Sequence, residues 1–154
     1  MSQEILSSDQ TFTATTWYRV LYADTDNMKI VNNGHYFRYF EQGRGEYLRQ
    51  LKMPYSEIEK RGYYTPLTEA WAHFYASFHY DELIRIECWV SLIKKASFRF
   101  DYRLYHEDSQ ELRVAGHTVH ATLNHNLKVV KIPDWLLEYI SPGSKVNPKN
   151  TDRL

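Results

Sequence analysis

The chain has 154 residues, 16% of them aromatic, and its 19 basic and 19 acidic side chains cancel. This length predicts one domain over residues 1–154, with flexible tails at 1–10 and 141–154. The balanced charge gives no net attraction to nucleic acid or to a membrane surface. The lone cysteine, Cys88, excludes an internal disulfide. With no signal peptide and no apolar run long enough to span a bilayer, we expect a cytoplasmic protein.

A strand and then a long helix are predicted in the first third of the chain. Residues 11–22 carry apolar side chains with a period of two, which predicts a strand. A helix is expected from about Asn33 to Leu51, with Asn32 or Asn33 as its N-cap. Gly43 and Gly45 lie inside this helix, where each costs about 1 kcal/mol relative to alanine. Close packing of the helix on a sheet is the expected compensation.

The rest of the chain is predicted to be mostly strand. Alternation of apolar and polar residues predicts strands near 70–78, 84–92, 98–104 and 112–123, and a short last strand is expected at 129–132. A short helical turn is expected at 56–60, after Pro54, and a last helix at 134–140, opened by Pro133 and Asp134. In the 112–123 strand the apolar positions change from even to odd around Gly116, which predicts a bulge there. One long helix among antiparallel strands predicts an α+β fold.

Two aspartates, Asp24 and Asp26, lie between the first strand and the helix. The first N–H groups of a helix have no intrahelical acceptor and carry the positive end of the helix dipole. A carboxylate beside them can attack a carbonyl carbon, or deprotonate water next to it, while the N–H groups hold the carbonyl oxygen. The segment is therefore a candidate site for acyl chemistry. The alternative is that the two aspartates only shape a turn or cap the helix.

The run from Tyr22 to Glu41 resembles the start of the hotdog-fold acyl-CoA thioesterases, the group that includes 4-hydroxybenzoyl-CoA thioesterase and the YbgC-like proteins. A weaker match extends from about Trp17 to about Ile140. The resemblance implies a hotdog fold, in which an antiparallel sheet is wrapped around one long central helix. The family usually has glycine where this chain has Lys29, so Lys29 is expected to reshape the loop before the helix. The matching positions are Asp24, Asp26, Val31, Asn32, Asn33, Tyr36, Arg38, Tyr39, Phe40, Glu41 and Arg44.

The resemblance also implies a reaction, the hydrolysis of an acyl-CoA thioester to a carboxylic acid and free CoA. Asp26 would be the nucleophile or the general base, the N–H of Asn33 would polarise the carbonyl, and Gly34 would let the substrate approach closely. The turn formed by Lys94, Lys95 and Ser97 aligns with a basic turn that meets the CoA phosphates in some relatives. Coenzyme A would enter only as part of the substrate, with no other cofactor, and the site would lie between the subunits of a homodimer or homotetramer.

Several alternatives stay open. A metal site is not predicted, because His117 and His120 are three residues apart on a strand and point to opposite faces. Two lysines in a turn are often only solvated charges, and Asn33 can be a simple cap. A thioesterase acting on an acyl carrier protein, or a hotdog protein that binds acyl ligands without hydrolysis, would fit the same resemblance. Lys29 favours the second of these, and the acyl group is not specified by the sequence.

Overall fold

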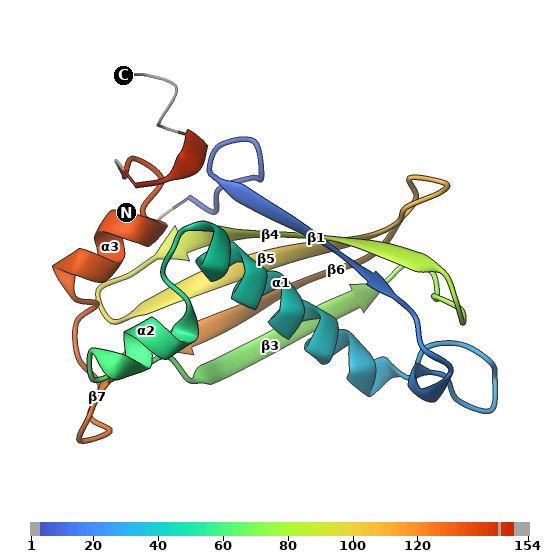
Figure 1. The fold of residues 1–154 in the computed structure, drawn as a ribbon, viewed down its shortest axis with the longest axis horizontal. Coiled ribbons are helices and arrows are strands. Elements are labelled where there is room, and N and C mark those ends of the chain that lie inside the picture. Colours follow the sequence, from blue (N-terminus) through green and yellow to red (C-terminus); the bar gives the residue numbers. More distant parts are fainter. Residues whose placement is uncertain (1–3, 145, 150–154) are drawn as a thin grey trace.

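A five-stranded antiparallel sheet wraps around one long helix in the computed structural model, which describes residues 4–144 and 146–149 (Figure 1). The strand order is β1-β4-β5-β6-β3, so β1 and β3 form the two edges. The predicted α+β hotdog architecture is therefore confirmed. The strands are β1 (Thr13–Arg19), β3 (Leu67–Phe74), β4 (Leu83–Ile93), β5 (Ser97–His106) and β6 (Leu112–Ala121), and the helix is α1 (Tyr36–Gln50).

The remaining helices and strands are short. The 3-10 turns η1 (Tyr22–Asp24) and η2 (Asn33–His35) precede α1, and α2 (Tyr55–Lys60) follows it. The two-residue strands β2 (Tyr63–Tyr64) and β7 (Leu123–Asn124) pair with each other. The last helix, α3 (Asp134–Ile140), matches its predicted position.

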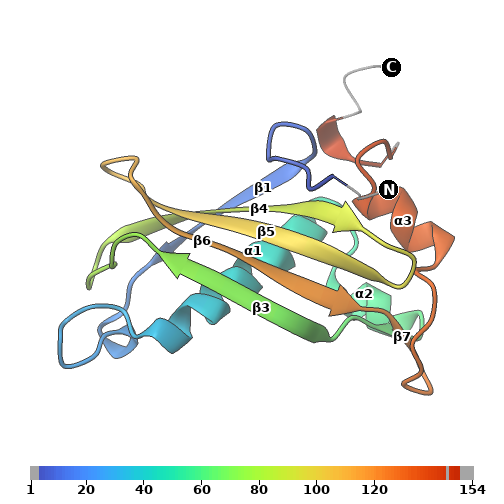
Figure 2. The same cartoon turned by 180° about the vertical axis from the view of Figure 1, so that it is seen from behind.

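The core lies between α1 and the face of the sheet that α1 covers. Figure 2 shows the molecule from behind, with the sheet in front of α1. The Phe40 ring stacks on the Tyr102 ring with centroids 4.4 Å apart. Gly43 faces the sheet so closely that a Cβ there would lie 2.9 Å from the Ile86 Cγ2 atom, which confirms the predicted close approach. Gly45 instead faces a cavity described below. Each large apolar side chain buried in this layer contributes about 1.5–3 kcal/mol.

The predicted bulge at Gly116 is wrong. Gly116 pairs regularly with Tyr102 on one side and Ala72 on the other. The buried positions of β6 stay even-numbered throughout, and after Gly116 they are occupied by the polar residues Thr118 and His120. Glycine is required because a Cβ at position 116 would lie 2.3 Å from the Phe40 ring. The alternation of β6 therefore continues past Gly116, but the inward positions there are polar, so the apolar pattern in the sequence does not show it.

The predicted strand at 129–132 is also not formed. Val129 makes a single bridge to Leu123, and the sheet pairing of this region belongs to β7 instead. The β-strand predicted for 11–22 is shorter than expected, since β1 ends at Arg19 and the chain turns into η1.

The described parts of the two segments predicted as tails contact the folded body. The Leu6 carbonyl accepts a hydrogen bond from the Trp89 indole N–H (2.9 Å), and the Leu6 N–H donates to the Ser91 carbonyl (2.9 Å). Near the other end, Asn147 is fully buried and the Lys149 ammonium donates to the Ser8 carbonyl (2.9 Å). Residues 1–3, 145 and 150–154 of these predicted tails lie outside the described residues. In the part of the chain that is described, no helix has the length and apolar character needed to cross a membrane.

Candidate functional site

The loop between β1 and α1 folds back on itself as a short hairpin, here called the site loop (residues 24–33). The Asn32 N–H donates to the Asp24 carbonyl (2.9 Å), and the Asp26 N–H donates to the Ile30 carbonyl (3.0 Å). These paired bonds close the hairpin, so Asp24 and Asp26 lie on one arm and the start of the helix follows the other arm.

A second segment, residues 75–82, holds the site loop in place. It connects β3 to β4 and runs against the loop: the Val31 N–H donates to the Phe78 carbonyl (2.9 Å), and Ile30 forms a bridge with His79. The Phe78 side chain is fully buried. The site loop is therefore fixed by backbone bonds on both arms rather than left as a free surface loop.

Asp24 is buried in this arrangement, with 3% of its surface exposed. Its carboxylate accepts hydrogen bonds from the Tyr18 hydroxyl (2.7 Å), the Leu21 N–H (3.0 Å) and the Tyr39 hydroxyl (3.1 Å). Burial alone would raise the pKa of Asp24, but these donors outweigh it and hold the pKa below its ordinary value. All three donors reach the same oxygen, Oδ2, so this buried carboxylate is suited to holding β1, the loop and α1 together.

Asp26 differs from Asp24 because its carboxylate remains partly exposed. One of its oxygens accepts a hydrogen bond from the Met28 N–H (2.8 Å), the ordinary turn contact of an aspartate. This is the only hydrogen bond of the Asp26 side chain with the described residues. The carboxylate therefore keeps acceptor capacity for a water molecule or a substrate carbonyl.

Lys29 occupies the turn of the hairpin and adopts a left-handed backbone conformation, with φ 63°. Its N–H donates to the Asp26 carbonyl (2.9 Å), which closes the turn. Glycine adopts this conformation freely, whereas other residues incur a cost of about 1–2 kcal/mol. The structure thus shows strain at Lys29 rather than an opened loop.

Asn33 and Gly34 begin the helical segment, as predicted. The helix cap is Asn32, whose side-chain oxygen accepts a hydrogen bond from the Gly34 N–H (3.0 Å) and whose carbonyl accepts one from His35 (2.9 Å). These bonds leave the Asn33 N–H without an acceptor among the described residues. An unpaired N–H at a helix start, in the same loop as an accessible carboxylate, is the arrangement that the sequence predicted for acyl chemistry.

Lys94, Lys95 and Ser97 do not lie near the site loop of the same chain. They form the turn between β4 and β5, at the opposite end of the sheet from the site loop (Figure 1). The turn is closed by the Lys94 N–H, which donates to the Ser97 carbonyl (2.8 Å). Both lysines are exposed, and Lys94 and Ser97 line a small cavity of about 170 Å³ together with Arg99.

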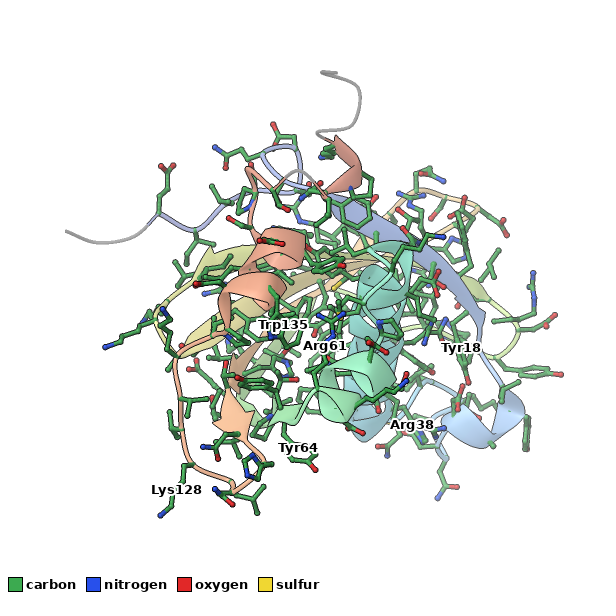
Figure 3. All side chains as sticks on the ribbon, turned by 60° about the vertical axis from the view of Figure 1, so that its left-hand side comes forward. Tyr18, Arg38, Arg61, Tyr64, Lys128 and Trp135 are labelled. Atoms are coloured by element: carbon green, nitrogen blue, oxygen red, sulfur yellow. The ribbon has the colours of Figure 1, made fainter. Side chains whose placement is uncertain are left out.

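A larger cavity of about 780 Å³ lies beside α1, and sequence reasoning did not find it. Its wall includes Tyr18 and Tyr39, which bind Asp24, so the cavity reaches the base of the site loop. Three of its lining residues, Tyr18, Arg38 and Tyr64, are labelled around α2 in Figure 3. Apart from Tyr39 and Gly45, the part of this wall that α1 forms consists of charged and amide side chains, which in sequence have the pattern of an ordinary solvent-exposed face.

A chain of buried hydrogen bonds runs behind this cavity. The Tyr102 and Thr118 hydroxyls are 2.6 Å apart, the Thr118 hydroxyl is 2.9 Å from His120 Nε2, and His120 Nδ1 is 3.0 Å from the Thr65 carbonyl oxygen. Burial lowers the pKa of His120 to about 4, so the ring is neutral at pH 7. Because the Thr65 carbonyl can only accept, Nδ1 carries the proton and Nε2 accepts from Thr118.

The fold and the site were compared with known proteins. A family model described as the Thioesterase-like superfamily matches residues 20–140. A protein of Aquifex aeolicus named "Putative esterase" is 32% identical over 122 residues, which cover 79% of this chain and 93% of that protein. A Bacillus subtilis protein named "Putative acyl-CoA thioesterase YneP" is 26% identical over 125 residues, which cover 78% of this chain and 90% of that protein.

A solved structure shows the same likeness in three dimensions. The DHNA-CoA thioesterase from Staphylococcus aureus aligns with a TM-score of 0.75 and 26% sequence identity, covering 80% of this chain and 86% of that one. The residues matched by the family model, 20–140, contain the site loop, α1 and the strands β3, β4, β5 and β6.

Proposed function

Because the chain belongs to the thioesterase-like superfamily and is a thioester hydrolase, we propose that it hydrolyses acyl-CoA thioesters with Asp26 as the reacting carboxylate. The observation that carries this proposal is the contrast between the two aspartates of the site loop. Asp24 is buried and accepts three hydrogen bonds on one oxygen, whereas Asp26 is partly exposed and has one hydrogen bond to the described residues. Asp26 is therefore the more accessible of the two carboxylates to a substrate.

The chemistry follows from the groups around Asp26. The unpaired N–H of Asn33 would donate to the thioester carbonyl oxygen and stabilise the negative charge that develops there. As a general base, Asp26 would take a proton from water as the water oxygen attacks the carbonyl carbon. As a nucleophile, it would attack that carbon itself and form a mixed anhydride, which water then hydrolyses. In both routes the C–S bond breaks, and the products are a carboxylic acid and free CoA.

We also propose that the working site lies between two copies of the chain. The Lys94–Ser97 turn and the site loop are at opposite ends of the sheet, so one chain cannot use both on one CoA molecule (Figure 1). A two-fold axis at the edge strand β3 would pair this strand with its copy and reverse the second sheet. The partner's β4–β5 turn would then lie at the same end as the site loop of the first chain.

The edge strand β3 is suited to such pairing. One of its edges has no neighbouring strand among the described residues, and large apolar side chains on and next to it are exposed. Trp71, for example, is 48% exposed. An open edge with exposed apolar side chains invites pairing with another strand. The exposed side chains are Leu67, Trp71, Phe74 and Tyr75.

Two other functions fit the same fold. A thioesterase for an acyl carrier protein would not need a clamp for the CoA nucleotide. Lys29 in place of the usual glycine was the reason to consider a non-hydrolytic acyl-binding protein. Because Lys29 adopts the left-handed conformation of this turn, the substitution no longer argues against hydrolysis. No observation of the site favours either function over acyl-CoA hydrolysis.

The test is an assay of thiol release from a panel of acyl-CoA thioesters, repeated with the same acyl groups on pantetheine and on an acyl carrier protein. Acyl-CoA hydrolysis in the wild type, with a loss in the Asp26→Asn variant, supports the proposal. Faster turnover on the carrier protein would assign the alternative enzyme, and no turnover on any carrier would assign the binding protein.

A further inference from the structure

The cavity beside α1 is lined by a partly buried arginine that forms no ion pair with a carboxylate of the described residues. Arg44 belongs to α1 and lines the cavity of about 780 Å³. The Tyr102 and Tyr55 hydroxyls lie within interaction distance of its guanidinium and Glu41 is a further electrostatic neighbour, but no aspartate or glutamate of the described residues lies within ion-pair distance of it. The neighbouring arginines differ, because Arg49 pairs with Glu46 at 3.1 Å and Arg61 pairs with Glu57 at 3.3 Å.

The hydroxyls around Arg44 are neutral and do not supply a counter-charge. Burial raises the pKa of Tyr55 to about 12 and also raises the pKa of Tyr102. Tyr102 donates its proton to Thr118, because the hydrogen bonds behind it run toward neutral His120. The Tyr55 hydroxyl is buried beside Arg44, and no described residue accepts its proton. The cavity thus contains a fixed cation and a free donor.

A cation that is partly withdrawn from water loses part of its hydration, and an anion beside it restores that loss. The cavity has room for such an anion, and its wall also offers aromatic and apolar contacts from Tyr63, Tyr64 and Ile58. A guanidinium binds the two oxygens of a carboxylate through a pair of parallel hydrogen bonds, and it binds a phenolate oxygen through one. The missing partner of Arg44 therefore has the chemistry of an acidic oxygen attached to an apolar or aromatic body.

Resting on the proposed thioesterase function, we propose that the substrate is an acyl-CoA whose acyl group carries an acidic oxygen at its far end. The body of this acyl group occupies the cavity beside α1. Arg44 binds the acidic oxygen, and the Tyr55 hydroxyl donates a second hydrogen bond to it. A plain alkyl or aryl group leaves the charge of Arg44 without an anion and the Tyr55 proton without an acceptor, so it is the poorer substrate.

The test uses matched pairs of thioesters that differ only at the far end. The first pair is adipoyl-CoA and hexanoyl-CoA, and the second is 4-hydroxybenzoyl-CoA and benzoyl-CoA. We expect kcat/KM to be about tenfold higher or more for the oxygen-bearing member of one pair, as fits a hydrogen bond to a charged group. A preference in the first pair identifies a carboxylate, and a preference in the second identifies a phenol.

Three variants connect the preference to the arginine. Arg44→Met keeps the packing of the aliphatic stem and removes the charge, so it should bring the two members within about twofold of each other, mainly by lowering kcat/KM for the oxygen-bearing member. Arg44→Lys should keep part of the preference. Arg61→Met is the matched control, because Arg61 lies outside the cavity lining and packs on Trp135. Equal kcat/KM values within both wild-type pairs, or an unchanged preference in folded Arg44→Met, would overturn the inference.

A binding measurement separates this inference from the proposed function. Adipate and hexanoate, and likewise 4-hydroxybenzoate and benzoate, are titrated calorimetrically into the wild type and the Arg44 variants. Tighter binding of the oxygen-bearing acid that depends on Arg44 supports the site even if thioester turnover is absent. Robust turnover without any preference, in either binding or rate, rejects the site and leaves the thioesterase function in place.

Discussion

The Tyr39 hydroxyl donates a hydrogen bond to the Asp24 carboxylate (3.1 Å), and this contact joins the site loop to the first turn of α1. The Tyr18 hydroxyl of β1 reaches the same oxygen (2.7 Å), and the two tyrosine rings pack with centroids 4.8 Å apart. One carboxylate therefore fixes the relative positions of a strand, a loop and a helix. This explains why two aspartates so close in sequence differ in accessibility, and the difference can be tested residue by residue.

Asp26→Asn is expected to lower kcat for acyl-CoA hydrolysis by about 10²-fold or more, because asparagine keeps the shape but neither deprotonates water nor attacks a carbonyl. Thiol release measures the rate, and thermal unfolding checks that the variant is folded. Asp108→Asn, a change to an exposed aspartate outside the site loop, is the matched control and should keep the full rate. A folded Asp26→Asn variant with the wild-type rate would contradict the assignment.

Asp24→Asn is expected to lower the free energy of unfolding by about 1.5–3 kcal/mol at pH 7, since hydrogen bonds to a charged group are lost. The native pKa of Asp24 lies below its ordinary value. Its stabilisation is therefore complete above the unfolded-state pKa of about 3.9 and is lost as the pH falls through the lower native pKa. Urea unfolding of both proteins should show a constant difference from pH 8 to about 5 and a shrinking one below about 4.

Tyr39→Phe provides the control for this pH effect, because it removes one donor and keeps the ring. It should produce a smaller loss of stability than Asp24→Asn at pH 7. A difference between wild type and Asp24→Asn that stays constant down to the acid unfolding transition would mean that Asp24 is not stabilised as a carboxylate.

Lys29→Gly is expected to change the melting temperature by only a few degrees and to keep activity. The relief of left-handed strain at φ 63° is offset by the greater freedom of glycine in the unfolded chain. Lys29→Val should clearly lower the melting temperature, because a branched side chain fits this conformation poorly. Thermal unfolding and thiol release measure both variants, and equal stability of the two would show that the turn does not require φ above zero.

The chain is expected to form a dimer or a larger oligomer through β3. Light scattering at micromolar concentration should give at least twice the chain mass of 18.4 kDa. Phe74→Lys places a charge beside the open edge and should shift the protein toward the monomer and lower its activity. A stable wild-type monomer that hydrolyses acyl-CoA would exclude a site shared between two chains.

Much of the fold follows from local patterns in the sequence. The period of two found β4 and β5, because their inward residues are all apolar, and the helical stripe found α1. In β6 the same reasoning failed after Gly116, because Thr118 and His120 face inward and satisfy each other by hydrogen bonds. The periodicity argument identifies the inward face of a strand by its apolar residues, so it fails where a buried position holds a polar side chain with its own hydrogen-bond partner.

The candidate site divides in the same way. Asp26 and Asn33 could be assigned to one candidate site from the sequence because they are seven residues apart in a single loop with a recognisable pattern. The cavity was not, since its lining comes from positions as distant as Tyr18 and His120, which only the folded chain brings together. The absence of an ion pair at Arg44 could not be predicted either. Glu41 lies one helical turn before Arg44, so the sequence alone would suggest an ion pair between them.

Lys94 and Lys95 are expected to bind the phosphates of CoA and to take no part in the chemistry. Both lysines are exposed in the β4–β5 turn, far from the site loop of their own chain. Exposed ion pairs contribute only about 0.2–1 kcal/mol, and contacts made equally in the ground state and the transition state affect KM rather than kcat. The double variant Lys94→Ala, Lys95→Ala should therefore raise KM for acyl-CoA by roughly two- to fivefold, with the effect fading as salt increases. The same acyl group on pantetheine, which lacks the nucleotide, should be hydrolysed at the wild-type rate. Equal losses on both substrates would mean that the lysines act through structure, and an unchanged KM for acyl-CoA would mean that they are only solvated.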